Sequence, residues 1–140
     1  MNKLLVTTDL SDLSRTGISH AKQLLKQYPK MEVIVLFVIE KHLPNPLYAH
    51  YEKPIPTRDE AMQQLIEFLG EDAVLFTPKI TIAENIHEGI IAVAKKLKVD
   101  FIRIASHGYG SLKSFFIGST TQKLIEKCPI PIITNSVATI

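Results

Sequence analysis

The stretch Asp100–Ser119, DFIRIASHGYGSLKSFFIGS, is the part of the sequence from which the fold can be worked out. It begins with the apolar run Phe101–Ala105, which predicts a buried strand, and breaks at Ser106–Gly110, the densest turn signal in the chain. It resumes at Gly118–Thr120, where hydroxyl side chains favour a helix start. Glycines let backbone N–H groups approach an anion, and a helix N-terminus adds donors and partial positive charge. This order of strand, glycine-bearing loop and helix start suits a phosphate.

The composition is that of a globular domain, with 46% hydrophobic and 21% charged residues and no Trp. We therefore expect one domain over residues 1–140. A net charge of +2 with scattered Lys and Arg residues argues against nucleic acid and anionic membranes as partners. The N-terminus turns polar after about five residues, too early for a signal peptide or a membrane span, which favours a cytoplasmic protein. The single cysteine, Cys128, excludes an internal disulfide and reads as a small buried hydrophobe.

Strands and helices are predicted to alternate along the whole chain. The expected strands are Lys3–Thr8, Glu32–Ile39, Ala73–Ala83 (broken by Pro78 and at an edge), Phe101–Ala105 and Ile130–Thr134. The expected helices are Leu13–Gln27 (starting near Ser11 or Asp12), Thr57–Gly70 (capped by Thr57 with Glu60), Ile86–Lys98 (capped by Asn85) and Gly118–Lys127. The connector Glu40–Thr57 is long and rich in proline, which indicates a lid, a binding loop or disorder.

This alternation predicts an α/β fold: one doubly wound, parallel, five-stranded sheet with helices on both faces. In such a sheet the ligand crevice lies at the carboxyl ends of the strands, where the strand order reverses. With the first strand central, Thr8 and Asp9 bound that crevice on one side. The loop from Ala105 to Gly118 bounds it on the other. Two separate arguments, from loop chemistry and from topology, therefore indicate the same place.

At Ser106-His107-Gly108 and Gly118-Ser119 the chain resembles the universal stress protein family. The family's nucleotide motif is Gly, two residues, Gly, nine residues, then Gly followed by Ser or Thr. Gly108, the nine residues Tyr109–Ile117, and Gly118-Ser119 match it, whereas Ala105 stands at the first Gly. The resemblance spans the chain, because VTTDLSDLSRTGISHA resembles the family's opening strand and helix and IEKCPIPIIT its closing ones.

The resemblance implies a Rossmann-like (HUP-type) fold with the strand order 3-2-1-4-5. It also implies an adenine nucleotide, ATP or AMP, with or without Mg²⁺. Thr8 and Asp9 would face the adenine and ribose, and Val38 would line the adenine pocket. The triphosphate would approach the backbone along the loop that starts at Ala105. The residues implied for the phosphates are His107, Gly108, Gly118, Ser119 and Thr120. Four of these residues also have a purely structural interpretation. Asp9, Ser119 and Thr120 could be helix caps, and His107 could be a loop residue with local hydrogen bonds.

The expected function is that of a small stress-response sensor or regulator, with ATP hydrolysis at most slow and incidental. Ala105 keeps open an alternative, a nucleotide-free interaction protein that uses the Glu40–Thr57 connector. A hydrolase or nucleotidyl transferase based on His107 is disfavoured, because adjacent Ser106 and His107 point apart and no nucleophile elbow surrounds them. No P-loop motif is present, and His20, His42, His50 and His87 show no metal-ligand spacing.

The tail from Cys128 to Ile140 contains no charged side chain. A final strand at Ile130–Thr134 would leave an apolar sheet edge, which natural proteins cover or pair. Pairing with a second copy about a two-fold axis would cover it, and the family resemblance implies a homodimer through this strand. The alternative is a loop of the same chain over the edge.

Overall fold

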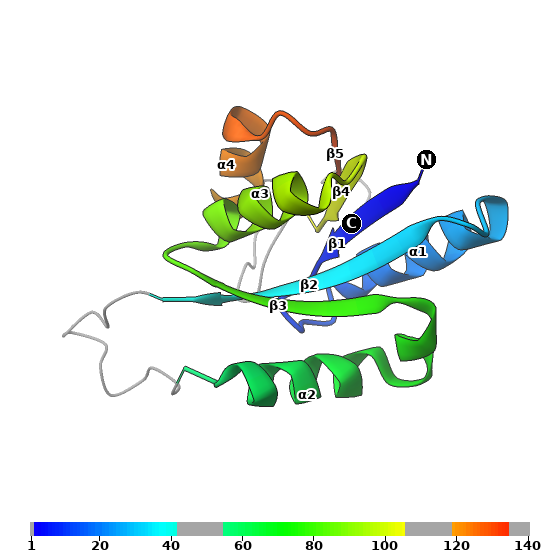
Figure 1. The fold of residues 1–140 in the computed structure, drawn as a ribbon, viewed down its shortest axis with the longest axis horizontal. Helices are drawn as coiled ribbons and strands as arrows, with labels where there is room; N and C mark the ends of the chain where they lie inside the picture. Colours follow the sequence, from blue (N-terminus) through cyan, green and yellow to red (C-terminus); the bar gives the residue numbers. More distant parts are fainter. Residues whose placement is uncertain (1, 42–54, 106–118, 135–140) are drawn as a thin grey trace.

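A computed structural model describes residues 2–41, 55–105 and 119–134 of the 140-residue chain. Within these residues strands and helices alternate, as the sequence predicts (Figure 1). The elements are β1 (Lys3–Thr7), α1 (Arg15–Gln27), β2 (Glu32–Glu40), α2 (Arg58–Leu69), the 3₁₀ helix η2 (Gly70–Leu75), β3 (Thr77–Ala83), α3 (Ile86–Leu97), β4 (Phe101–Ile104), α4 (Ser119–Lys127) and β5 (Ile132–Thr134).

The strands form one five-stranded sheet in the order β3-β2-β1-β4-β5, and every neighbouring pair is parallel. This confirms the predicted doubly wound fold and its strand order. The chain builds β1, β2 and β3 outward in one direction and then returns to place β4 on the other side of β1. The strand order therefore reverses between β1 and β4.

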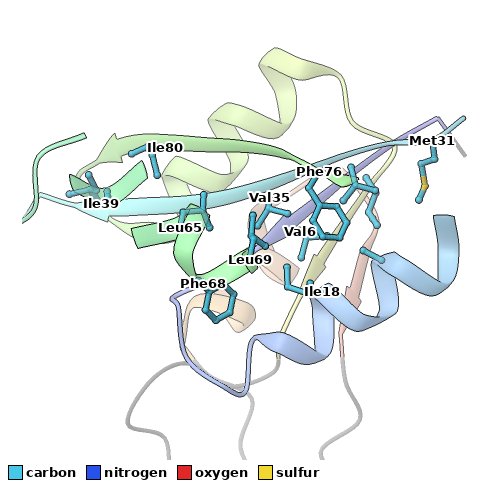
Figure 2. Close-up of a cluster of buried hydrophobic side chains, with 14 residues drawn as sticks. Val6, Ile18, Met31, Val35, Ile39, Leu65, Phe68, Leu69, Phe76 and Ile80 are labelled. Atoms are coloured by element: carbon cyan, nitrogen blue, oxygen red, sulfur yellow. The ribbon is translucent and has the colours of Figure 1, made fainter. Parts of the chain in front are cut away.

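Each face of the sheet carries its own apolar core, because successive side chains along a strand point to opposite faces. Figure 2 shows one core, where Val6 and Val35 of the sheet meet Ile18 of α1 and Leu65 of α2. The opposite core lies under α3 and α4 and contains Leu5, Ile90 and Leu124, among others. β1 and β2 are buried on both faces, which explains why their sequences read as continuous apolar runs.

The caps of α2 and α3 lie where the sequence predicts them. The Thr57 side chain accepts a hydrogen bond from the Glu60 N–H at 3.2 Å, and its hydroxyl donates to the Glu60 carboxylate. The Asn85 side chain accepts from the Glu88 N–H at 3.1 Å. Gly70 ends α2 with a φ of 57°, a conformation that favours glycine. These short motifs set both helix starts locally.

The first helix begins later than predicted. The expectation was a start near Ser11 or Asp12, but α1 starts at Arg15, and Ser14 precedes it with no side-chain cap. Bonds from the Ser14 and Arg15 N–H groups to the carbonyls of Ser11 and Asp12 form tighter turns first. The polar side chains that looked like caps instead fold the segment between strand and helix.

The third strand is also shorter than predicted, because Ala73–Leu75 belongs to η2 and β3 starts at Thr77. Pro78 does not break this strand, since it lies in register with Val35 of β2. Pro78 lacks an N–H donor, which an edge strand tolerates, and β3 is at the sheet edge as predicted.

The last strand, β5, is confined to Ile132–Thr134. Cys128 is partly buried and packs against the core under α3 and α4, close to the predicted role of a small hydrophobe. Among the described helices none is long and apolar enough to cross a membrane.

Candidate functional site

The ends of β1 and β4 lie side by side at the point where the strand order reverses. Val6 of β1 is paired with Arg103 of β4, and Thr8 and Ala105 each follow two residues later, just after their strands end. On the other side of β1, the Thr8 N–H donates to the Leu36 carbonyl of β2 at 3.0 Å. Thr8 and Ala105, at which the two predicted borders of the crevice begin, thus lie at the same carboxyl end of the sheet.

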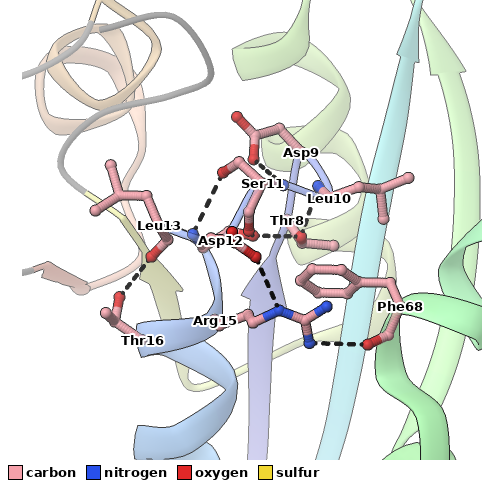
Figure 3. A network of polar contacts seen from close by, with 10 residues as sticks. Thr8, Asp9, Leu10, Ser11, Asp12, Leu13, Arg15, Thr16 and Phe68 are labelled. Carbon is pink, nitrogen blue, oxygen red and sulfur yellow. Dashed lines mark hydrogen bonds and ion pairs between the residues drawn. The ribbon is translucent and has the colours of Figure 1, made fainter. Parts of the chain in front are cut away.

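The segment after β1 is folded by its own side chains (Figure 3). The Leu10 N–H donates to the Thr8 hydroxyl oxygen, and the Ser11 N–H donates to Asp9 Oδ1, each at 2.9 Å. Leu10 has a φ of 68°, a left-handed conformation that costs a non-glycine residue about 1–2 kcal/mol. Strained backbone of this kind is typical of functional turns, because the surrounding contacts must hold it.

The hydroxyl protons in this turn can be assigned from the contacts. Ser14 donates its one hydroxyl proton to the Ser11 carbonyl at 2.7 Å. The 2.7 Å contact between the Thr8 and Ser14 hydroxyls therefore uses the Thr8 proton. Thr8 is buried, so its hydroxyl shapes the turn from within. Asp9 is half-buried, and its carboxylate is a hydrogen-bond acceptor that bonds the Ser11 N–H.

Val38, the predicted adenine-pocket residue, lies near the end of β2 and is 8% exposed. Its side chain points to the face covered by α3 and packs in that core. A Cβ on Gly89 of α3 would lie 2.9 Å from Val38 Cγ1 and 3.0 Å from the Ala83 Cβ. Gly89 therefore lets α3 approach the ends of β2 and β3 closely, and the sequence analysis missed this role.

A buried hydroxyl joins the end of β4 to the first turn of α4. Thr121 Oγ1 donates to the Ala105 carbonyl at 3.0 Å, and Thr121 is 2% exposed. Ser119 is the first residue of α4 and is exposed, and Thr120 follows it half-buried. The sequence analysis singled out Ser119 and Thr120 but missed Thr121, which the run of three hydroxyl residues at a helix start could have indicated.

Ala105 is accommodated without a left-handed backbone. Among the described residues, positive φ at a non-glycine position occurs at Leu10 and Lys98, and Ala105 is not one of these. The remaining predicted residues, His107, Gly108 and Gly118, lie outside the described residues. The same holds for most of the Glu40–Thr57 connector, of which residues 42–54 are not described.

The buried Arg103 and the partly buried His20 lie away from the carboxyl end of the sheet, on the face covered by α1. Arg103 of β4 is 4% exposed, and its Nε donates to His20 Nδ1 at 3.1 Å while Nη1 donates to the Ile104 carbonyl. Burial, and then the Arg103 charge, lower the pKa of His20. Burial, with Lys123 and Lys127 nearby, also lowers the pKa of His87. Within the described part of the chain no group of three or more acidic, His or Cys residues could hold a metal ion.

The model of the family described as "Universal stress protein family" matches residues 1–134. The chain belongs to this family. Universal stress protein MJ0577 of Methanocaldococcus jannaschii is 29% identical over 94% of this chain and 92% of its own length. The membership confirms the resemblance seen at the Gly108–Ser119 motif.

Solved structures agree with this assignment. The structure of MJ0577 superposes with a TM-score of 0.71 at 28% identity and covers 95% of this chain and 94% of its own. The UspA protein of Lactobacillus plantarum gives 0.66 at 21% identity over 95% and 96%. A universal stress protein solved in complex with cAMP gives 0.63 at 14% identity over 97% of both chains. The last two likenesses show the shared fold.

Proposed function

We propose that this universal stress protein binds an adenine nucleotide at the carboxyl ends of β1 and β4 and acts as a stress-response sensor or regulator. The proposal rests on one observation above all: the Thr8–Asp9 turn and the end of β4 meet where the strand order reverses. Open α/β sheets bind ligands at this position. A family member of the same fold was solved in complex with cAMP, which supports an adenine ligand.

In the proposed complex, Asp9 accepts the ribose hydroxyls, because it follows the carboxyl end of β1 and its carboxylate is a hydrogen-bond acceptor. The phosphates lie toward the N-terminus of α4, where Ser119, Thr120 and the first backbone N–H groups supply donors. The resemblance to the family's nucleotide site adds three further residues to the phosphate site: His107, Gly108 and Gly118. Val38 is 8% exposed, so little of its side chain can touch the adenine; it shapes the pocket mainly by packing against α3. Mg²⁺ would accompany ATP through the phosphates.

The ligand role of Asp9 can be separated from its structural role by Asp9→Asn. Asparagine keeps one oxygen, which the Ser11 N–H bond uses, and loses the charge and the second acceptor. We expect the variant to fold normally and to bind ATP and AMP about tenfold or more weakly, the loss of one charge-assisted hydrogen bond. Titration calorimetry on nucleotide-stripped protein measures this, with ATP tested with and without Mg²⁺.

Asp59→Asn is the matched control, because it is the same change at an exposed carboxylate in the first turn of α2, outside this turn. Equal affinity of Asp9→Asn and the wild type would remove Asp9 from the site. Absence of binding by the wild type at millimolar nucleotide would contradict the proposed function. It would favour the nucleotide-free interaction protein, for which the departure at Ala105 is the supporting feature.

A further inference from the structure

Arg15 occupies a position that its own helix does not explain. It is the first residue of α1, where the partial positive charge of the helix disfavours a cation. The first turn of α1 contains no acidic residue, and Ser14 makes no side-chain cap. Local helix stability thus gives no reason for an arginine here. The reason lies in what its side chain reaches.

The guanidinium of Arg15 extends to the C-terminal end of α2 (Figure 3). Its Nη1 donates to the Phe68 carbonyl at 3.0 Å, and its central carbon lies 4.0 Å from the centre of the Phe68 ring. Phe68 belongs to the last turn of α2, where carbonyls lack helical partners and a cation is favoured. That last turn has no basic residue of its own. Arg15 therefore supplies the missing donor and charge.

The same side chain also holds the turn that carries Asp9. The Arg15 Nε lies 3.3 Å from Asp12 Oδ1. The Arg15 backbone N–H also donates to the Asp12 carbonyl at 3.1 Å, a bond that does not depend on the side chain. The ion pair alone contributes little, because the Arg15 and Asp12 side chains are 51% and 102% exposed. The bond and stacking on the buried Phe68 form the firm anchor.

We infer that Arg15 is a positioning residue: it fastens the far end of the Thr8–Ser14 turn to α2 and so holds Asp9 in its binding orientation. The path runs from Phe68 through Arg15 to its chain neighbour Ser14. It continues through the bond from the Ser14 hydroxyl to the Ser11 carbonyl, and ends at the Ser11 N–H, which donates to Asp9. The link from this orientation to affinity rests on the proposed nucleotide site. The ordering of the turn itself does not.

The test compares Arg15→Met, which removes both polar contacts, with Arg15→Lys, which keeps one charge without the planar fork. Lys22→Met is the matched control, because it removes the other charged contact of α1 with this layer, Lys22 to Asp72 of η2 at 3.1 Å. Amide hydrogen exchange at Leu10 and Ser11 reports the turn directly, since these N–H groups make its two side-chain bonds. Calorimetry with ATP reports the affinity.

We expect Arg15→Met to speed exchange at Leu10 and Ser11 about tenfold. We also expect it to weaken ATP binding about five- to tenfold, because a loose turn must be ordered on binding. Arg15→Lys should recover part of both effects, and Lys22→Met should change neither.

Unchanged exchange in Arg15→Met, or the same acceleration in Lys22→Met, would overturn the inference. Faster exchange with unchanged affinity would overturn the link to binding. If the wild type binds no nucleotide, the proposed function fails, and the exchange data still decide whether Arg15 orders the turn.

Discussion

Thr121 shows how one buried hydroxyl can hold a binding edge together. It connects α4, where the phosphates are proposed to bind, to Ala105, the residue that follows β4. The Ala105 carbonyl thus accepts its hydrogen bond from a side chain of α4. Residues that fasten the ends of a site in this way determine its geometry without touching a ligand.

Thr121→Val preserves the side-chain shape but removes the donor to Ala105. We expect the free energy of unfolding to fall by about 1 kcal/mol, the net value of such a hydrogen bond. Thr121→Ser keeps the donor and should retain more of the nucleotide affinity than Thr121→Val. Urea unfolding and calorimetry measure the two quantities. Identical behaviour of the two variants in both would show that the hydroxyl contributes nothing.

The contact between Arg103 and His20 predicts a pH dependence of stability. His20 Nδ1 accepts a hydrogen bond and so must be unprotonated, and burial together with the Arg103 charge lowers its folded-state pKa below 6.5. The unfolded chain therefore takes up this proton first as the pH falls. The part of the unfolding free energy that depends on His20 is fully present above pH 6.5. It declines as the pH falls from 6.5 through the lowered pKa of His20. His87 acts in the same direction.

His20→Asn distinguishes the effect of His20 on the pH dependence from that of His87, because asparagine offers Arg103 an acceptor that does not titrate. We expect the difference in unfolding free energy between this variant and the wild type to be constant above neutrality. Below pH 6.5 it should move in favour of the variant. Urea unfolding at a series of pH values measures it. If the unfolding free energies of the variant and the wild type fall in parallel below pH 6.5, His20 has no role in the pH dependence.

At the scale of the elements, the closeness of α3 to the sheet depends on Gly89. Gly89→Ala would press a Cβ against Val38 and the Ala83 Cβ at 2.9 and 3.0 Å. We expect a loss of about 1–3 kcal/mol in unfolding free energy from overpacking. This outweighs the advantage of about 1 kcal/mol that alanine has over glycine in a helix. Thermal and urea unfolding test it.

Gly17→Ala in α1 is the control for Gly89→Ala, because it is the same change in a helix of the opposite layer. Its Cβ would meet Val6 Cγ1 at 3.3 Å and Arg103 Cγ at 3.6 Å, contacts that small shifts relieve. We expect this variant to be close to neutral. Similar losses in both variants would mean that the approach of α3 is not unusually close.

At the scale of the whole molecule, the sheet ends at β5, which pairs with β4 alone among the described strands. Its three residues are each half-buried, and Cys128–Ile140 carries no charged side chain. We predict a homodimer through this edge, because an uncharged apolar edge tends to pair. Sedimentation equilibrium at micromolar concentration should give twice the 15.7 kDa chain mass. A monomer under these conditions would rule the dimer out.

The sequence by itself determined the fold class, the strand order and the caps of α2 and α3. The fold class and the caps follow from local information: apolar runs such as Glu32–Ile39, and side chains such as Thr57 and Asn85 that bond three residues ahead. The strand order followed from the family resemblance. The sequence also indicated that Thr8, Asp9 and Ala105 lie at the same end of the sheet, because parallel strands have their carboxyl ends on the same side. The proposed ligand contacts themselves remain predictions, and His107, Gly108 and Gly118 lie outside the described residues.

Tertiary structure alone decided the remaining features. Ser14 and Thr8 fold the turn and delay α1 because their hydroxyls meet across it, a competition that sequence spacing does not resolve. Gly89 and Arg15 matter through partners fifty or more residues away, Val38 and Phe68. Such contacts depend on how two elements pack, and the residue type alone does not reveal the distance between them.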